Sequence, residues 1–112
     1  MSGEFWEEAD RLCSTAEVVI DRPAESAHPR FPKWVYPVDY GYLDGTSGGD
    51  GEGIDVWVGT AADDRVTGVV CTVDPHKRDS EVKFLWNCTV REVERIQDFY
   101  EGQPMKVILV AR

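Results

Sequence analysis

The chain has 112 residues, of which 42% are hydrophobic and 11% aromatic, so it is long enough for one folded domain with a modest core. Its 21 acidic residues against 12 lysines and arginines give a formal net charge of −9, which disfavours binding to nucleic-acid backbones and anionic membranes. The 3 cysteines have no Cys-x-x-Cys spacing, which argues against a zinc site and a disulfide framework.

The beginning of the chain carries no basic stretch followed by an apolar one, so we expect no signal peptide. No apolar run approaches the roughly 18 residues of a membrane-spanning helix. The predicted compartment is therefore the cytoplasm. The predicted organisation is a single domain over residues 1–112, without internal repeats or a linker.

The first predicted element is an amphipathic helix over residues 3–13. Its apolar side chains recur at helical intervals and share one face, which consists of Phe5, Ala9, Leu12 and Cys13. Charged residues occupy the opposite face. The apolar face can pack on the domain or on a second copy of the chain, and the pattern leaves both open.

A short β-branched strand is predicted next, over residues 16–21, and Pro23 ends it. Four prolines between residues 23 and 37 predict an extended loop, because proline lacks the backbone N–H that regular structure needs. A second loop, rich in glycine, is predicted over residues 43–53.

Four further strands and one more helix complete the prediction. The strands cover residues 54–59, 66–73, 81–86 and 105–111, and a tight turn covers residues 74–79. Thr89 caps the helix at residues 89–100, where Glu92 completes a capping box. Five short strands with a helix near each end predict an α+β fold with a small curled sheet or barrel.

Three carboxylates, Asp50, Glu52 and Asp55, lie within six residues of one another. Unpaired acids so close together repel one another, and a divalent cation would remove that penalty. All the donors are oxygens, which favours Mg²⁺, Mn²⁺ or Ca²⁺ over zinc. The spacing does not match an EF-hand loop. The alternative is a solvated acidic turn before a strand.

Three other acids have ordinary explanations when each is considered alone. Asp74 and Asp79 bracket the predicted tight turn, as solvated charges of a hairpin commonly do. Asp21 ends the first predicted strand, where a turn acid is commoner than a metal ligand. The argument for a site therefore depends on all the acids together.

Four segments form a recognisable set: Val18-Val19-Ile20-Asp21-x-Pro23, Tyr36-Pro37-x-Asp39-Tyr40-Gly41-Tyr42, Asp50-Gly51-Glu52-Gly53-Ile54-Asp55-Val56, and Gly68 followed by Asp74 and Asp79. In this order they resemble the soluble family I inorganic pyrophosphatases, and the segment 89–101 resembles that family's C-terminal helix. The resemblance implies a small five-stranded OB-like β-barrel with N-terminal and C-terminal helices. It also implies magnesium-dependent hydrolysis of pyrophosphate to two phosphates.

The resemblance further implies roles for individual residues. The metal ligands would be Asp50, Asp55, Asp74 and Asp79, with Asp21 reaching a metal through water. Glu52 stands where the family has the acid that orients and deprotonates the attacking water, and Tyr40 matches a tyrosine near the nucleophile and phosphate. The phosphate-binding residues would be Arg30, Lys33, Tyr40 and Lys83. The expected cofactor is Mg²⁺, with Mn²⁺ as an alternative, and the expected substrate is pyrophosphate or a related small phosphoanhydride.

The chain departs from the family pattern at several positions. Glu52 and Asp21 differ in length from the family residues, with Glu in place of Asp and Asp in place of Glu. The hairpin before the Tyr-Pro motif is shortened, and the Tyr-Lys pair after the last helix has no counterpart. Glu81 replaces a lysine, for which Lys83 on the same strand face can substitute.

These departures leave other functions open. The chain can be a catalytically weak relative that binds metal and phosphate, or a hydrolase of another phosphoanhydride. An OB-like module that binds a protein or nucleic acid is a third interpretation, which the negative charge disfavours for nucleic acid. A homo-oligomer is also an open prediction.

Overall fold

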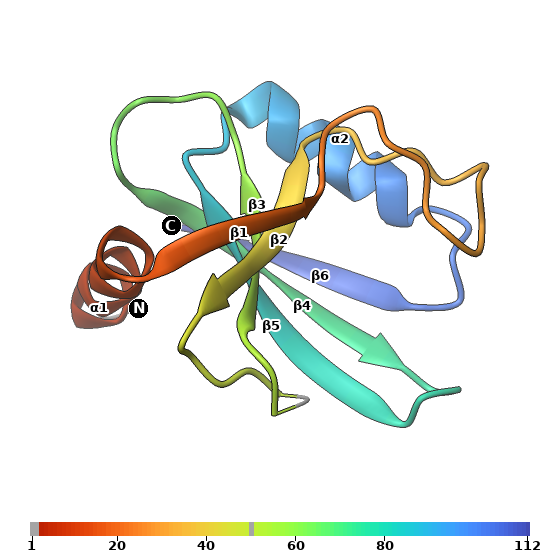
Figure 1. Ribbon diagram of the computed structural model, residues 1–112, viewed down its shortest axis with the longest axis horizontal. Coiled ribbons are helices and arrows are strands. Elements are labelled where there is room, and N and C mark those ends of the chain that lie inside the picture. Colours follow the sequence, from red (N-terminus) through yellow and green to blue (C-terminus); the bar gives the residue numbers. More distant parts are fainter. Residues whose placement is uncertain (1–2, 50) are drawn as a thin grey trace.

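The computed structural model describes residues 3–49 and 51–112, and it has the predicted α+β architecture (Figure 1). The elements in chain order are α1 (Gly3–Thr15), β1 (Glu17–Arg22), β2 (Asp39–Asp44), β3 (Ile54–Val58), β4 (Val66–Asp74), β5 (Asp79–Trp86), α2 (Val90–Tyr100) and β6 (Lys106–Ala111). All the predicted strands are present, with β2 in addition. Neither of the described helices is long and apolar enough to cross a membrane.

The strands form one six-stranded mixed sheet in the order β1-β2-β3-β5-β4-β6. Neighbouring strands are antiparallel except β3 and β5, which are parallel. The prediction of a closed five-stranded barrel is wrong, because β1 and β6 lie at the two ends of the strand order and the sheet is open. The strands fan out from the middle of the molecule, as expected of a strongly twisted sheet (Figure 1).

The additional strand, β2, lies in the tyrosine-rich segment that the sequence presented as a motif. Gly41 in β2 is opposite Ile20 in β1, and a Cβ at position 41 would lie 1.8 Å from the backbone oxygen of Val19. The two strands therefore approach so closely that only glycine fits. Glycine lowers strand propensity, which is why this strand is hard to recognise from its composition.

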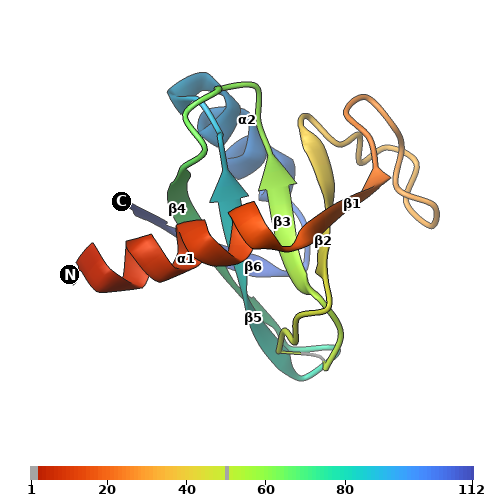
Figure 2. The ribbon, with the colours of Figure 1, turned by 60° about the vertical axis from the view of Figure 1, so that its left-hand side comes forward.

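Helix α1 packs on one face of the sheet, in front of the strands in Figure 2. Trp6, Ala9 and Cys13 are buried, whereas Phe5 is 44% and Leu12 39% exposed. The predicted apolar face was correct for Ala9 and Cys13 and wrong for Phe5 and Leu12, because the larger Trp6 ring takes the core position. The sheet residues of this core are Leu43, Val56, Val66, Val69, Phe84 and Trp86.

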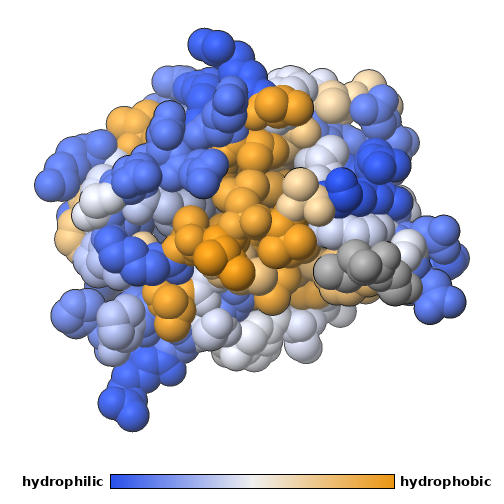
Figure 3. All heavy atoms as spheres, turned by 180° about the vertical axis from the view of Figure 1, so that it is seen from behind, coloured by the Kyte–Doolittle hydropathy of each residue, from blue (hydrophilic) through white to orange (hydrophobic). Residues whose placement is uncertain are grey.

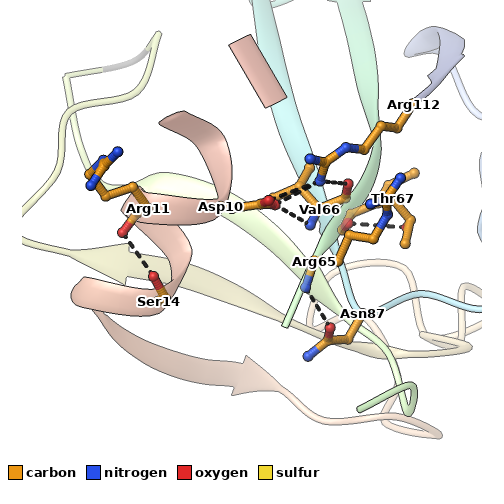
Figure 4. A network of polar contacts seen from close by, with 9 residues as sticks. Asp10, Arg11, Ser14, Arg65, Val66, Thr67, Asn87 and Arg112 are labelled. Carbon is orange, nitrogen blue, oxygen red and sulfur yellow. Dashed lines mark hydrogen bonds and ion pairs between the residues drawn. The ribbon is translucent and has the colours of Figure 1, made fainter. Parts of the chain in front are cut away.

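Polar contacts fasten α1 to the sheet (Figure 4). Asp10 of α1 accepts hydrogen bonds from the backbone N–H of Val66, at 2.7 Å, and from the guanidinium of Arg112. Nearby, Asn87 accepts a hydrogen bond from the backbone N–H of Arg65 at 3.0 Å. These contacts join the first helix, the start of β4 and the end of the sequence.

Helix α2 covers the opposite face, and its predicted cap is confirmed. Thr89 and Glu92 form the capping box, and Glu92 also accepts from the backbone N–H of Thr60 at 3.1 Å. The core beneath α2 contains Tyr36, Val38, Trp57, Val70, Leu85, Cys88, Ile96 and Tyr100. The sheet thus separates two apolar cores. All 3 cysteines are free thiols, as expected.

Part of the α1 face of the sheet remains open to solvent. Val73, Val82 and Ile108 on β4, β5 and β6 are 52%, 47% and 66% exposed. Seen from behind, the molecule has a continuous apolar area bordered by charged residues (Figure 3). The polar site described below lies on the other face of the same strands.

Candidate functional site

Strand pairing brings the separate acidic motifs onto one face of the sheet. Tyr42 of β2 is opposite Asp55 of β3, and Asp74 of β4 is opposite Asp79 of β5. Side chains two residues apart on a strand point to the same side, so further residues join this face. The polar set named here consists of Tyr40, Tyr42, Asp55, Thr72, Asp74, Asp79, Glu81 and Lys83. This is the face that α2 partly covers.

An open acidic cavity of about 520 Å³ lies beside this polar set. Its lining residues are Asp21, Tyr42, Asp44, Gly51, Glu52, Gly53 and Asp55. Three of the predicted site residues, Asp21, Glu52 and Asp55, therefore meet around one space although they come from separate segments. Asp50, predicted as a metal ligand, lies outside the described residues. Asp44 was not singled out in the sequence, although its place at the end of the Tyr-Gly-Tyr segment is a usable signal.

Lys83 is the buried cation of the site, with only 4% of its surface exposed. Its Nζ donates to Asp55 Oδ2 at 2.7 Å, to Tyr40 Oη at 2.8 Å and to Glu81 Oε2 at 3.3 Å. An ammonium has three N–H donors, and each has an acceptor here. Such full pairing is what makes burial of a charged amine tolerable.

The protonation states of Lys83 and Tyr40 follow from this arrangement. Burial acts against the charged form of Lys83, but the hydroxyl groups of Tyr40 and Tyr100 and the Asp55 carboxylate outweigh it and raise the pKa of Lys83 above its usual value. Burial raises the pKa of Tyr40, although Lys83 opposes the change. Near neutral pH, Lys83 is therefore an ammonium and Tyr40 a neutral phenol, so neither can act as the general base.

The two acids of the β4–β5 turn are in different surroundings. Asp74 is buried, and its Oδ1 accepts from the backbone N–H groups of His76, at 2.9 Å, and Lys77, at 3.2 Å. Asp79 Oδ1 is buried without a hydrogen-bond partner. Thr72, 2% exposed on the same face, has an unpartnered Oγ1 as well. Buried polar atoms without partners are rare, and a bound ion or water would satisfy both of these atoms.

We tested whether these residues suit a metal ion. Among residues 3–49 and 51–112, no group of three Asp, Glu, His or Cys side chains converges closely enough to hold one. The chemistry of the donor set nevertheless fits a hard cation, because the cavity presents carboxylate oxygens. The Oδ1 atom of Asp79, at the β4–β5 turn, is a buried carboxylate oxygen without a hydrogen-bond partner. The oxygen donors are thus of the type that Mg²⁺ prefers, but the described residues do not bring them together as a metal-binding group, and Asp55 is already engaged by Lys83.

Several cations lie at the end of the sheet that carries the long 23–38 loop. Arg30 and Lys33, the predicted phosphate-binding residues, are exposed on this loop. Burial lowers the pKa of His28, and the charges of Arg22, Arg30 and Lys77 lower it further, so these three cations lie within electrostatic range of one ring.

Arg22 was not identified from the sequence. Burial raises the pKa of Tyr36 and the neighbouring Arg22 lowers it, which places this guanidinium beside the tyrosine ring that stacks on Tyr40 at 5.6 Å. The sequence offers one signal for Arg22, namely its position directly after Asp21, where the motif accepts any residue.

No protein-family model matches this chain, and no curated protein matches it.

Proposed function

We propose that this chain is a magnesium-dependent hydrolase that splits inorganic pyrophosphate into two phosphates. The observation that carries the proposal is that Asp21, Glu52 and Asp55, three of the acids that the pyrophosphatase-like motifs single out, line one open cavity of about 520 Å³. Lys83, which the motifs predict to bind phosphate, contacts the same Asp55 at 2.7 Å. A cavity of this volume is ample for a small phosphoanhydride.

The proposed metal ligands are Asp50, Asp55, Asp74 and Asp79, with Asp21 acting through water. When bound, Mg²⁺ lowers the pKa of a water molecule and neutralises phosphate charge. Binding of pyrophosphate as its magnesium complex reconciles an anionic substrate with a protein of net charge −9. Mn²⁺ has similar ligand preferences and is an alternative cofactor.

The side chains have distinct proposed tasks in the reaction. Glu52 orients the attacking water and accepts its proton while the new P–O bond forms and the bridging P–O bond breaks. Lys83 holds Tyr40 Oη at 2.8 Å, which fixes the phenol toward the phosphate. Basic side chains stabilise the charge that develops on the departing phosphate, and the proposed residues are Arg22, Arg30, Lys33 and Lys77.

The finer description of the fold is part of the same proposal. The strand order β1-β2-β3-β5-β4, with β3 and β5 parallel, supports an OB-like topology in which β6 extends the sheet next to β4. In OB-folds, ligands bind over one face of the sheet and its loops. The acidic cavity and the polar set also lie on one face here.

Phosphate release from pyrophosphate in the presence of Mg²⁺ tests this function. We expect turnover by the wild type and a loss of at least about 100-fold in Asp55→Asn, because a misplaced or missing catalytic ligand has effects of this order. Asp63→Asn, which removes an exposed acid from the β3–β4 loop, is the matched control and should retain activity. Absence of turnover in the wild type, or full turnover in Asp55→Asn, would contradict the proposal.

A second candidate is a protein that binds metal and phosphate without appreciable turnover. The contact of Lys83 with Asp55 favours it, because that carboxylate is already engaged by a cation. Calorimetric titration with Mg²⁺ and phosphate, beside the turnover assay, separates the two functions. Replacing pyrophosphate by nucleoside diphosphates and triphosphates in the assay tests hydrolysis of other phosphoanhydrides. Sedimentation velocity checks the predicted homo-oligomer.

A further inference from the structure

We propose that Lys83 is a built-in counter-ion that occupies one cation position of the acidic site, so that the wild-type chain binds divalent metal more weakly than its carboxylates allow. The inference rests on the proposed function in one respect, namely that the site takes a divalent metal. What is new is the residue that weakens metal binding, which is Lys83.

The ammonium of Lys83 lies at the centre of a group of oxygen atoms. Lys83 Nζ lies among three oxygens from three places in the chain, Asp55 Oδ2, Glu81 Oε2 and Tyr40 Oη, at 2.7–3.3 Å. The side chains of Lys83 and Glu81 are only 5% and 13% exposed. Carboxylate and hydroxyl oxygens around a cation are donors of the type that a hard metal ion prefers.

Lys83 is the positive charge that offsets the carboxylates of Asp55 and Glu81. Asp55 and Glu81 would be two partly buried carboxylates without compensation if Lys83 were neutral or absent. Two such anions repel each other and are costly to bury unless a cation joins them. Lys83 provides one positive charge against two negative ones, which leaves a net attraction for cations at Asp55.

Two buried polar atoms on the same face form no hydrogen bond with Lys83. Thr72 is opposite Glu81 in the β4–β5 pairing, and its buried Oγ1 has no hydrogen-bond partner. Asp79 Oδ1, on the same face and two residues before Glu81, is also buried and unpartnered. A cation or water bound on this face of the sheet would satisfy both atoms. The ammonium and a divalent ion would then share Asp55, with the ion repelled by its neighbour.

Calorimetric titration with Mn²⁺ in wild type, Lys83→Met and Lys83→Arg tests this role. We expect Lys83→Met to bind Mn²⁺ at least tenfold more tightly, or to bind one additional ion, because the competing charge is gone. Lys83→Arg keeps the charge and should resemble the wild type. Lys106→Met removes a lysine from the exposed edge of β6, and it controls for the change in net charge.

A stability measurement keeps the test decisive if Lys83→Met folds poorly. In EDTA this variant should have a lower melting temperature than the wild type, and Mn²⁺ should raise it by more than it raises that of the wild type. Unchanged or weaker Mn²⁺ affinity in Lys83→Met would overturn the inference. A Lys83→Met variant that stays unfolded at saturating Mn²⁺ would also overturn the inference, since Mn²⁺ is expected to bind where the Lys83 ammonium lies in the wild type.

These readouts are independent of turnover. A wild type that releases no phosphate refutes the proposed hydrolase, whereas tighter Mn²⁺ binding in Lys83→Met would still support the counter-ion role. An active wild type would support the proposed hydrolase. If Mn²⁺ affinity is nevertheless unchanged in Lys83→Met, the counter-ion role is refuted while the hydrolase stands.

Discussion

Asp10 and Arg112 are 102 positions apart in the sequence and form an ion pair in which Arg112 Nη1 lies 2.9 and 3.0 Å from the two carboxylate oxygens of Asp10. The same Nη1 donates to the backbone oxygen of Val66 at 3.1 Å, and the guanidinium lies over the Trp6 ring at 5.9 Å. The pair is partly buried, with side-chain exposures of 15% for Arg112 and 27% for Asp10. It therefore differs in kind from an exposed surface pair.

We expect Asp10→Ala to lower the free energy of unfolding by about 2–3 kcal/mol, because both the Val66 N–H and the Arg112 guanidinium lose their acceptor. Urea denaturation of both single variants and the Asp10→Ala/Arg112→Ala double variant should give a coupling energy of about 1 kcal/mol or more. Removing Glu8, whose exposed pair with Arg11 is the matched control, should leave stability unchanged. Additive effects of the two substitutions would contradict the expected coupling.

The contact between β1 and β2 gives a second prediction. Gly41→Ala places a Cβ 1.8 Å from the backbone oxygen of Val19, so the two strands must separate. We expect a loss of about 3 kcal/mol or more in the free energy of unfolding, at the upper end of overpacking effects. The same change at Gly3, where a Cβ meets nothing within 4 Å, should be nearly neutral. Equal stabilities of the two variants in urea would show that the close approach is not rigid.

Asp79 gives a third prediction, in which stability and metal response change in opposite directions. Its buried Oδ1 has no partner, so Asp79→Asn should raise the stability of the metal-free chain by about 1 kcal/mol, since a buried anionic oxygen becomes neutral. The same variant should lose the increase in melting temperature that Mg²⁺ produces in the wild type. Differential scanning fluorimetry in EDTA and in Mg²⁺ measures both effects. Asp98→Asn, on the exposed face of α2, should change neither.

Alkaline pH should destabilise the protein through its buried thiols. Burial raises the pKa of Cys13 and Cys88 to about 12, whereas a thiol in the unfolded chain titrates near about 8.5. Above that lower value, the unfolded state gives up its protons first. The free energy of unfolding should therefore fall as pH rises from about 8.5 toward 12, by at most about 1.4 kcal/mol per pH unit for each thiol.

Urea titrations between pH 8 and 10 measure this slope, below the range in which the tyrosines contribute strongly. The Cys13→Ala/Cys88→Ala variant should be less stable overall and show a flatter dependence on pH. A slope that is the same in both proteins would assign the alkaline loss of stability to other groups.

Elements with a strong local signal could be predicted from the sequence. The capping box of Thr89 and Glu92 marked the start of α2, and the β-branched runs marked the strands that the structure contains. By contrast, β2 depends on the close approach of Gly41 to Val19, which is a tertiary property that no local pattern records. The open sheet depends on β6 pairing with β4, which is equally non-local.

Only part of the site could be predicted from the sequence, because the rest also depends on contacts between segments that are distant in the chain. Motif spacing identified Asp21, Glu52 and Asp55, and the fold brings them to one cavity. It also identified Lys83, but not its burial among Asp55, Tyr40 and Glu81, since that follows from the parallel pairing of β3 with β5. The position of Arg22 beside Tyr36 depends on the path of the 23–38 loop, which the prolines leave irregular and the sequence does not specify.

The separation of the two cores gives the molecule an optical reporter of its own site. Trp57 lies on the α2 side with its ring 4.6 Å from that of Tyr40, whose hydroxyl accepts from Lys83, whereas Trp6 and Trp86 lie in the core beneath α1. An ion or phosphate that displaces the Lys83 ammonium would change the electric field at Trp57 and leave Trp6 and Trp86 in unaltered surroundings. The fourth tryptophan, Trp34 of the 23–38 loop, has to be replaced together with these two. Fluorescence of a chain that retains Trp57 alone should therefore report ligand entry directly, without a label.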